Sequence, residues 1–117
     1  MAAEQFLGAV LGGDARSLLE RHVPGAFDDA LANADQFFQV ELPAAAPWSF
    51  GEEDARLIEQ PILNVIGAET LPRFVQSAAI VQSLFPAAVR VELPGVGHLL
   101  MAQEPTAMAT RLAEFWR

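Results

Sequence analysis

A short apolar run, Ile62-Leu63-Asn64-Val65-Ile66, is followed directly by Gly67. A nearly continuous run of this length is typical of a strand that is buried on both faces of a parallel sheet. Residues 89–93 alternate apolar and charged side chains, which predicts a second strand with one covered face. The helical spacing over residues 71–85 places a helix between them. We therefore expect an α/β arrangement, β-α-β-α with parallel strands, over residues 61–117.

Two strands are too few for an independent sheet. A strand as apolar as residues 62–66 usually lies inside a sheet, with a neighbouring strand on each side. Residues 1–60 show no pattern typical of such a neighbouring strand. The missing strands are therefore expected from the N-terminal half of a larger fold or from self-association of this chain.

The first half of the chain is Ala-rich and predicts helices. Pairs of Gly and Pro residues end its predicted helices, and Asp14 is a suitable N-cap for the second helix. Near Pro61 the sequence pattern changes from helical spacing alone to alternating strand and helix patterns. The expected division is therefore a helical segment, 1–60, and an α/β segment, 61–117. The expected helices are 3–11, 15–22, 26–40, 52–59, 71–85 and 105–116. Residues 42–50 are expected to form an irregular connection or one short turn of helix.

Composition excludes several kinds of site. The 117 residues include no Cys and no Lys, which removes disulfides, thiolate metal sites, cysteine nucleophiles and lysine Schiff bases. Seven Arg against 15 acidic residues give a net charge of −8 without a basic run, so no nucleic-acid partner is expected. No apolar stretch is long enough to span a bilayer and no signal-peptide pattern is present, so we expect a cytoplasmic protein without a membrane partner. No metal site and no cofactor are predicted.

A histidine follows the second predicted strand in the segment Leu93-Pro94-Gly95-Val96-Gly97-His98. This position is the carboxyl end of a parallel sheet, where α/β proteins bind ligands. The ordinary pKa of histidine suits general-base catalysis near neutral pH. The alternative is that His98 caps the next helix or forms a hydrogen bond within its loop.

The order of these segments resembles the C-terminal part of the α/β-hydrolase fold. The resemblance covers residues 60–117 and rests on Gln60–Gly67, the helix after it, Phe85-Pro86-Ala87, Val89–Leu93, Gly95-Val96-Gly97-His98, and Glu104-Pro105 with the final helix. Residues 1–50, including Val23–Ala26 and Gln36-Phe37-Phe38, resemble the cap or lid helices that this family inserts. The resemblance implies hydrolysis of an ester or similar bond in a small apolar substrate, with His98 as the base of a catalytic triad.

The nucleophile that this family requires is not recognisable. No GxSxG motif occurs, and the serines are Ser17, Ser49, Ser77 and Ser83. Ser49 precedes Gly51 at the motif's spacing, but it lacks the leading glycine and a preceding strand, so it is interpreted as a loop residue. A chain that carries the triad histidine without a nucleophile is expected to be inactive alone.

The acid of the triad also departs from the family pattern. Relatives commonly place an Asp three residues after the strand-ending glycine, where this chain has Thr70. Glu69, one residue earlier, is the candidate acid. The alternatives are that Glu69 is a solvated loop carboxylate, or that the acid follows an earlier strand, as it does in some relatives.

Four aromatic residues of the cap-like half are candidates for a substrate pocket, namely Phe37, Phe38, Trp48 and Phe50. The alternative is that they serve only for packing, which is the usual role of such residues. A second hypothesis makes the whole chain a non-catalytic binding or assembly module, which would pair its open sheet edge with another subunit.

Overall fold

The computed structural model describes residues 2–117, which form two compact units. The first unit ends at Phe50 and the second is Gly51–Arg117. The boundary between the units therefore lies before the division that was expected near Pro61. The short helix α6 (Glu52–Ala55) belongs to the second unit. The chain contains both helices and parallel strands, as expected of the α/β class.

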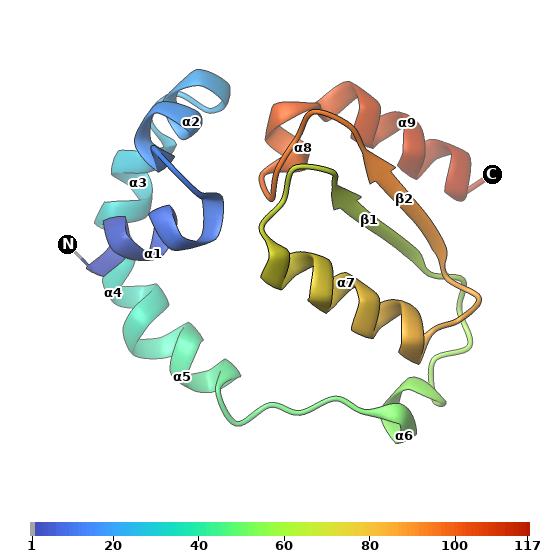
Figure 1. The fold of residues 1–117 in the computed structure, drawn as a ribbon. Coiled ribbons are helices and arrows are strands. Elements are labelled where there is room, and N and C mark those ends of the chain that lie inside the picture. Colours follow the sequence, from blue (N-terminus) through green and yellow to red (C-terminus); the bar gives the residue numbers. More distant parts are fainter. Residues whose placement is uncertain (1) are drawn as a thin grey trace. The chain divides into compact units, whose positions relative to one another are not determined.

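The described residues of the first unit contain helices and no strand (Figure 1). These helices are α1 (Ala2–Leu11), α2 (Ala15–His22), α3 (Ala26–Ala32), α4 (Ala34–Gln36), the π-helix η1 (Phe37–Glu41) and α5 (Leu42–Ala45). Helix α2 begins as predicted, because both carboxylate oxygens of Asp14 accept hydrogen bonds from Ser17, one from its backbone N–H at 3.0 Å and one from its hydroxyl at 2.6 Å.

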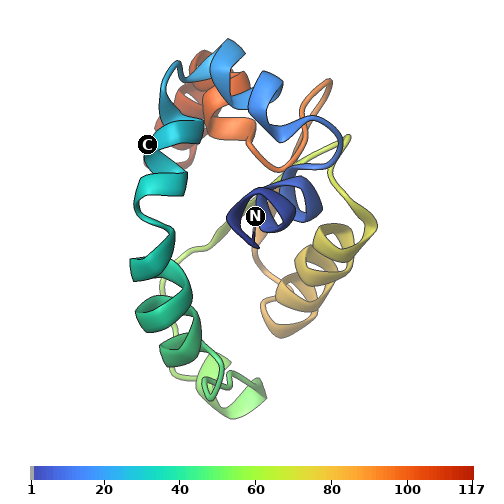
Figure 2. The same ribbon diagram turned by 90° about the vertical axis from the view of Figure 1, so that its left-hand side faces the viewer.

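The expectation of one continuous helix over 26–40 was wrong, whereas the short turn of helix that was one of the two alternatives for 42–50 is present as α5. The α-helix pauses at Asn33 and then continues through α4, η1 and α5 to Ala45, as the cyan-to-green turns of Figure 2 show. Pro43 explains the π-helical turns before it, because proline has no N–H and its ring collides with the carbonyl of the preceding turn. In η1 the N–H of Leu42 donates to the carbonyl of Phe37, five residues back, which widens the turn.

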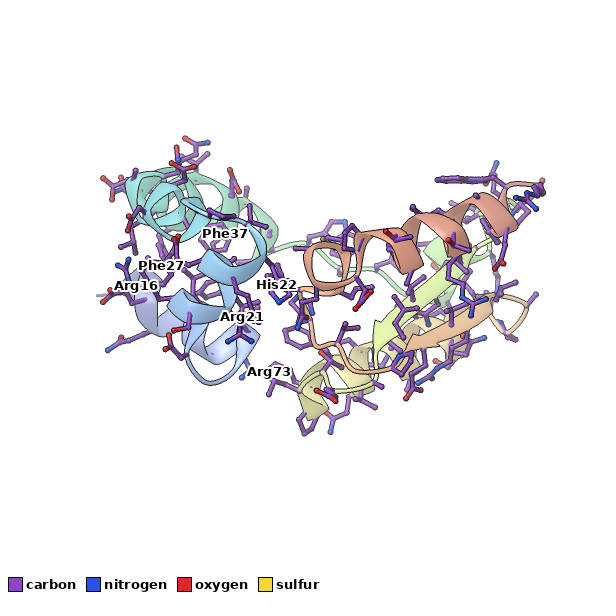
Figure 3. The ribbon with its side chains drawn as sticks, turned by 90° about the horizontal axis from the view of Figure 1, so that it is seen from above. Arg16, Arg21, His22, Phe27, Phe37 and Arg73 are labelled. Carbon is purple, nitrogen blue, oxygen red and sulfur yellow. The ribbon has the colours of Figure 1, made fainter. Side chains whose placement is uncertain are left out.

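The buried side chain of Phe27 anchors the first unit. Only 3% of its surface is exposed, and Ala3, Ala15 and Leu19 are also buried. The guanidinium of Arg16 lies 4.1 Å from the centre of the Phe27 ring and donates to the carboxylate of Asp28 at 3.1 Å (Figure 3). The arginine therefore covers the aromatic face that the helices leave open.

The second unit is built on two parallel strands. Strand β1 is Leu63–Gly67 and β2 is Val89–Leu93, paired in register from Leu63 with Val89 to Gly67 with Leu93. The predicted strand 62–66 is therefore shifted by one residue. Helix α7 (Pro72–Leu84) connects the strands, and α8 (Leu100–Gln103) and α9 (Pro105–Phe115) follow β2.

The two faces of this sheet are covered by different helices (Figure 1). On one face, the side-chain amide of Asn64 donates to the carbonyl of Ala78 in α7 at 3.0 Å. On the other face, α9 packs through Met108 on the hydrophobic core of the unit. That core consists of the buried residues Leu93, Val96 and Leu100, with Val65, Val91 and Ala107 half-buried against it.

Two short segments differ from the predictions. The expected helix over 52–59 ends as α6 at Ala55, because the chain must become extended before Pro61 and leaves the helix through tight turns at Leu57 and Ile58. Helix α8 was not predicted. No helix within residues 2–117 is both long enough and apolar enough to cross a bilayer.

Candidate functional site

The loop that carries His98 begins where β2 ends. A turn at Pro94-Gly95 reverses the chain, with Gly95 at a φ of 74°, a backbone conformation that favours glycine. Val96 then inserts into the core with 3% of its surface exposed. His98 follows two residues later, at the carboxyl end of the sheet, and its side chain is exposed to solvent. The predicted position of His98 is thus found.

The loop after β1 is bonded to the loop after β2. The N–H of Ala68 donates to the carbonyl of Leu93 at 2.8 Å, and the N–H of Glu69 donates to the carbonyl of Val96 at 2.9 Å. Gly67 makes this approach possible, because a side chain there would overlap the carbonyl oxygens of Val96 and Gly97. These contacts fix the path of the His98 loop two residues before the imidazole.

The imidazole of His98 is stacked on the ring of Phe74, near the start of α7. Partial burial lowers the pKa of His98 below its ordinary value of 6.5, because desolvation disfavours the charged imidazolium. The imidazole is therefore neutral at pH 7, and a neutral imidazole can accept a proton. Phe74 appeared in the sequence only as one apolar residue of a helical stripe.

Glu69 and His98 lie on bonded loops, but their side chains do not pair. No hydrogen bond or ion pair joins the Glu69 carboxylate to the imidazole anywhere in residues 2–117, and the Glu69 side chain is exposed. Desolvation alone accounts for the lowered pKa of His98. The role of Glu69 as the acid stays a prediction. At the neighbouring position, the hydroxyl of Thr70 is buried without a hydrogen-bond partner.

Gln103 supports the His98 loop from the far side. Its side-chain Oε1 accepts a hydrogen bond from the N–H of Gly97 at 3.0 Å, so α8 closes the loop around His98. Gln103 was not among the predicted site residues, because α8 is a single turn with no periodic signal. A polar side chain five residues after the candidate histidine was the available hint.

The serine hydroxyls show no sign of activation. The hydroxyl of Ser17 donates to Asp14, that of Ser77 to the carbonyl of Arg73, and that of Ser83 to the carbonyl of Ile80. Ser49 is exposed in the segment between α5 and α6, as expected for a loop residue. None of the four hydrogen-bonds to a histidine within the described residues.

The four aromatic candidates belong to two groups. Phe38 packs edge-on against both Phe37 and Phe6, and the rings of Phe37 and Phe6 are tilted, with ring centres 4.9–5.7 Å apart in the three pairs. Trp48 instead stacks on Phe50 at 5.7 Å. Phe37 and Phe38 line a cavity of about 490 Å³ between α1, α3, α4 and η1, whereas Trp48 and Phe50 do not. Figure 3 labels Phe37 among the side chains of the first unit.

No protein-family model, curated protein or solved structure matches this chain. The roles of its residues therefore rest on its own geometry. Within residues 2–117, no three His, Asp or Glu side chains are grouped so that they could hold a metal ion. The side chains with distinctive chemistry are the neutral imidazole of His98 and the aromatic wall around Phe37.

Proposed function

We propose that Gly51–Arg117 acts as the C-terminal part of a catalytic core of the α/β-hydrolase type, with His98 as its general base. The observation that carries this proposal is a neutral, solvent-accessible imidazole at the carboxyl ends of two parallel strands, on a loop fixed by backbone hydrogen bonds. A base at this position can serve a nucleophile that approaches from the same end of the sheet.

In the proposed reaction, His98 takes the proton from a nucleophile hydroxyl as the oxygen attacks the carbonyl carbon of an ester. The same proton is then given to the leaving alcohol when the carbon–oxygen bond breaks, which leaves the acyl group on the nucleophile. Water then attacks this acyl group and gives a proton to His98, and the proton returns to the nucleophile oxygen as the carboxylic acid leaves. The chain offers no activated serine, so the nucleophile comes from a segment outside these 117 residues or from a second subunit. The substrate class stays that expected from the resemblance, a small apolar ester or a similar molecule, and a cytoplasmic location stays a prediction.

The positions of Gly67, Phe74 and Gln103 support a catalytic role more than a merely structural one. A histidine that only closed a turn would not need a stacked ring on one side and a loop held from two directions. Preorganisation of this kind lowers the cost of orienting a base during reaction.

A short-chain nitrophenyl ester assay, run together with light scattering, tests the proposal. We expect no turnover from the monomer and turnover in a state in which the sheet is completed, either by self-association or by an added partner. His98→Ala should abolish that activity, whereas His22→Ala, which changes the other histidine, should not. Activity that survives His98→Ala would contradict the proposal.

An assembly module is the second candidate, and the outer edge of β1 favours it. Val89 donates to the carbonyl of Ile62 and Ala68 donates to Leu93, so the even-numbered residues of β1 face β2. The backbone groups of Leu63 and Val65 therefore point away from β2, and no partner accepts or donates there within the described residues. A defined oligomer that is inactive under all conditions would favour this function over catalysis.

A further inference from the structure

We propose that the cavity of the first unit binds a small amphipathic cation, an aromatic or alkyl group that carries a protonated amine. The inference does not depend on the catalytic role of His98, because every residue that it uses lies in residues 2–50. The cavity measures about 490 Å³, within the range of roughly 300–1,000 Å³ that is usual for small-molecule pockets.

The walls of the cavity are mostly apolar, and three of the lining residues are aromatic. The rings are those of Phe6, Phe37 and Phe38, which contact one another in tilted or edge-on arrangements. The other lining residues besides Glu41 are the apolar Ala3, Leu7, Ala30 and Ala34 and the polar Asn33 and Gln36. Each of the three rings is only half-buried, so part of each ring remains exposed to solvent. A flat ring or an alkyl chain can replace water on this surface, and burial of that area would supply the main part of the binding free energy.

Glu41 determines the sign of the preferred ligand. It is the one ionisable side chain that lines the cavity, and its carboxylate forms no hydrogen bond or ion pair within residues 2–117. Residues 1–50 contain seven acidic residues against two arginines, a net charge of −5, so the surrounding field also favours a cation. An anionic ligand would meet repulsion both at Glu41 and at long range.

The π-helix places the charge beside the rings. Phe37 and Glu41 are the first and last residues of η1, and both line the cavity. Pro43 follows η1 in α5. π-helical turns often occur at functional sites. The combination of an unpaired carboxylate with aromatic rings is suited to an alkylammonium group, which is attracted by the carboxylate and by ring faces.

Three probes of similar shape and different charge test the inference: phenylbutylamine, phenylbutanol and phenylbutyrate. An amide NMR titration of the full chain should show shifts at the cavity and the affinity order amine, alcohol, carboxylate. The expected preference for the amine over the alcohol is about 2- to 5-fold, the size of an exposed ion pair, and it should decrease with salt.

Matched variants test whether Glu41 and the cavity are responsible for the preference for the amine. Glu41→Gln should reduce the preference for the amine, leaving only the part due to the surrounding negative charge, and should leave the affinity for the alcohol unchanged. Glu4→Gln, an exposed acid of α1 outside the cavity lining, should change neither. Ala34→Leu should fill the cavity and weaken all three probes, with Phe38→Leu as a second variant if Ala34→Leu does not fold. His98→Ala should leave binding unchanged, which separates this inference from the catalytic proposal. Binding of no probe, equal affinities for the amine and the carboxylate, or an amine preference in Glu41→Gln as large as that of the wild type would overturn it.

Discussion

The imidazole of His98 lies almost parallel to the ring of Phe74, with ring centres 3.8 Å apart and planes inclined by 9°. The stack removes water from one face of the imidazole and leaves the other side open to solvent. This contact gives a physical basis for the lowered pKa of His98, because the charged form loses part of its hydration.

Replacing the stacked ring should raise the pKa of His98. Phe74→Leu keeps an apolar residue in α7 but removes the flat surface, so the pKa of the imidazole should move up toward 6.5. A pH titration of the imidazole signals by NMR measures the change. Val75→Ala, at the exposed neighbouring position, is the control and should leave the titration unaltered. An unchanged pKa in Phe74→Leu would mean that other atoms desolvate His98.

The stability of the chain should depend on the protonation of His98. The folded chain lowers the pKa of His98 and the unfolded chain does not, so the unfolded state binds the proton more readily. The stability due to the neutral imidazole is present above pH ~6.5 and is lost as the pH falls through the lowered folded pKa. Between pH ~7.5 and pH ~5.5, the free energy of unfolding measured with urea should therefore fall more for the wild type than for His98→Gln. If the free energy of unfolding fell equally with pH in the two proteins, this linkage would be contradicted.

The same substitution at two glycines should have opposite effects. Gly67→Ala places a methyl group against the carbonyl oxygens of Val96 and Gly97 and should destabilise the chain by about 1–3 kcal/mol. Gly8→Ala lies within α1, where the nearest neighbouring atom is 4.0 Å from the new carbon, and should stabilise the chain by up to ~1 kcal/mol. Denaturant unfolding measures both. A tolerated alanine at position 67 would show that the two loops are not held in close contact.

The side-chain oxygen of Gln103 should stabilise the folded chain as a hydrogen-bond acceptor. Gln103→Leu leaves the N–H of Gly97 without a partner and should cost about 1 kcal/mol, with faster exchange of the Gly97 amide proton. Gln103→Glu keeps an acceptor at the same position and should retain most of the stability and the slow exchange. If both variants lose stability equally, the side chain acts through packing and not through this hydrogen bond.

A proline at the outer edge of β1 should be tolerated by the monomer. The N–H of Leu63 points away from β2, so Leu63→Pro removes no bond of the sheet, and the monomer should unfold at nearly the same denaturant concentration as Leu63→Ala. Any self-association through this edge should be weaker in Leu63→Pro than in Leu63→Ala, measured by light scattering over a range of concentrations. A large extra loss of monomer stability in Leu63→Pro would place that N–H within the sheet.

The sequence by itself determined the two strands and the two long helices of the second unit. The apolar run before Gly67 and the alternation from Val89 predicted two parallel strands, and both are present. The helix between them and the final helix lie within one or two residues of their expected bounds, with Pro72 and Pro105 at their first positions. These features depend on neighbours along the chain, so composition and periodicity are sufficient to predict them.

Only the tertiary structure decided which residues surround His98 and how the aromatic residues are grouped. Phe74 and Gln103 reach the His98 loop from different helices, and Phe6 joins Phe37 from the other end of the first unit. Periodicity indicates which side of a helix is apolar, but it carries no information about which residue that side will contact. The same limit applies to Glu69, whose spacing suggested a partner for His98: the loops meet through backbone hydrogen bonds, while its carboxylate faces solvent.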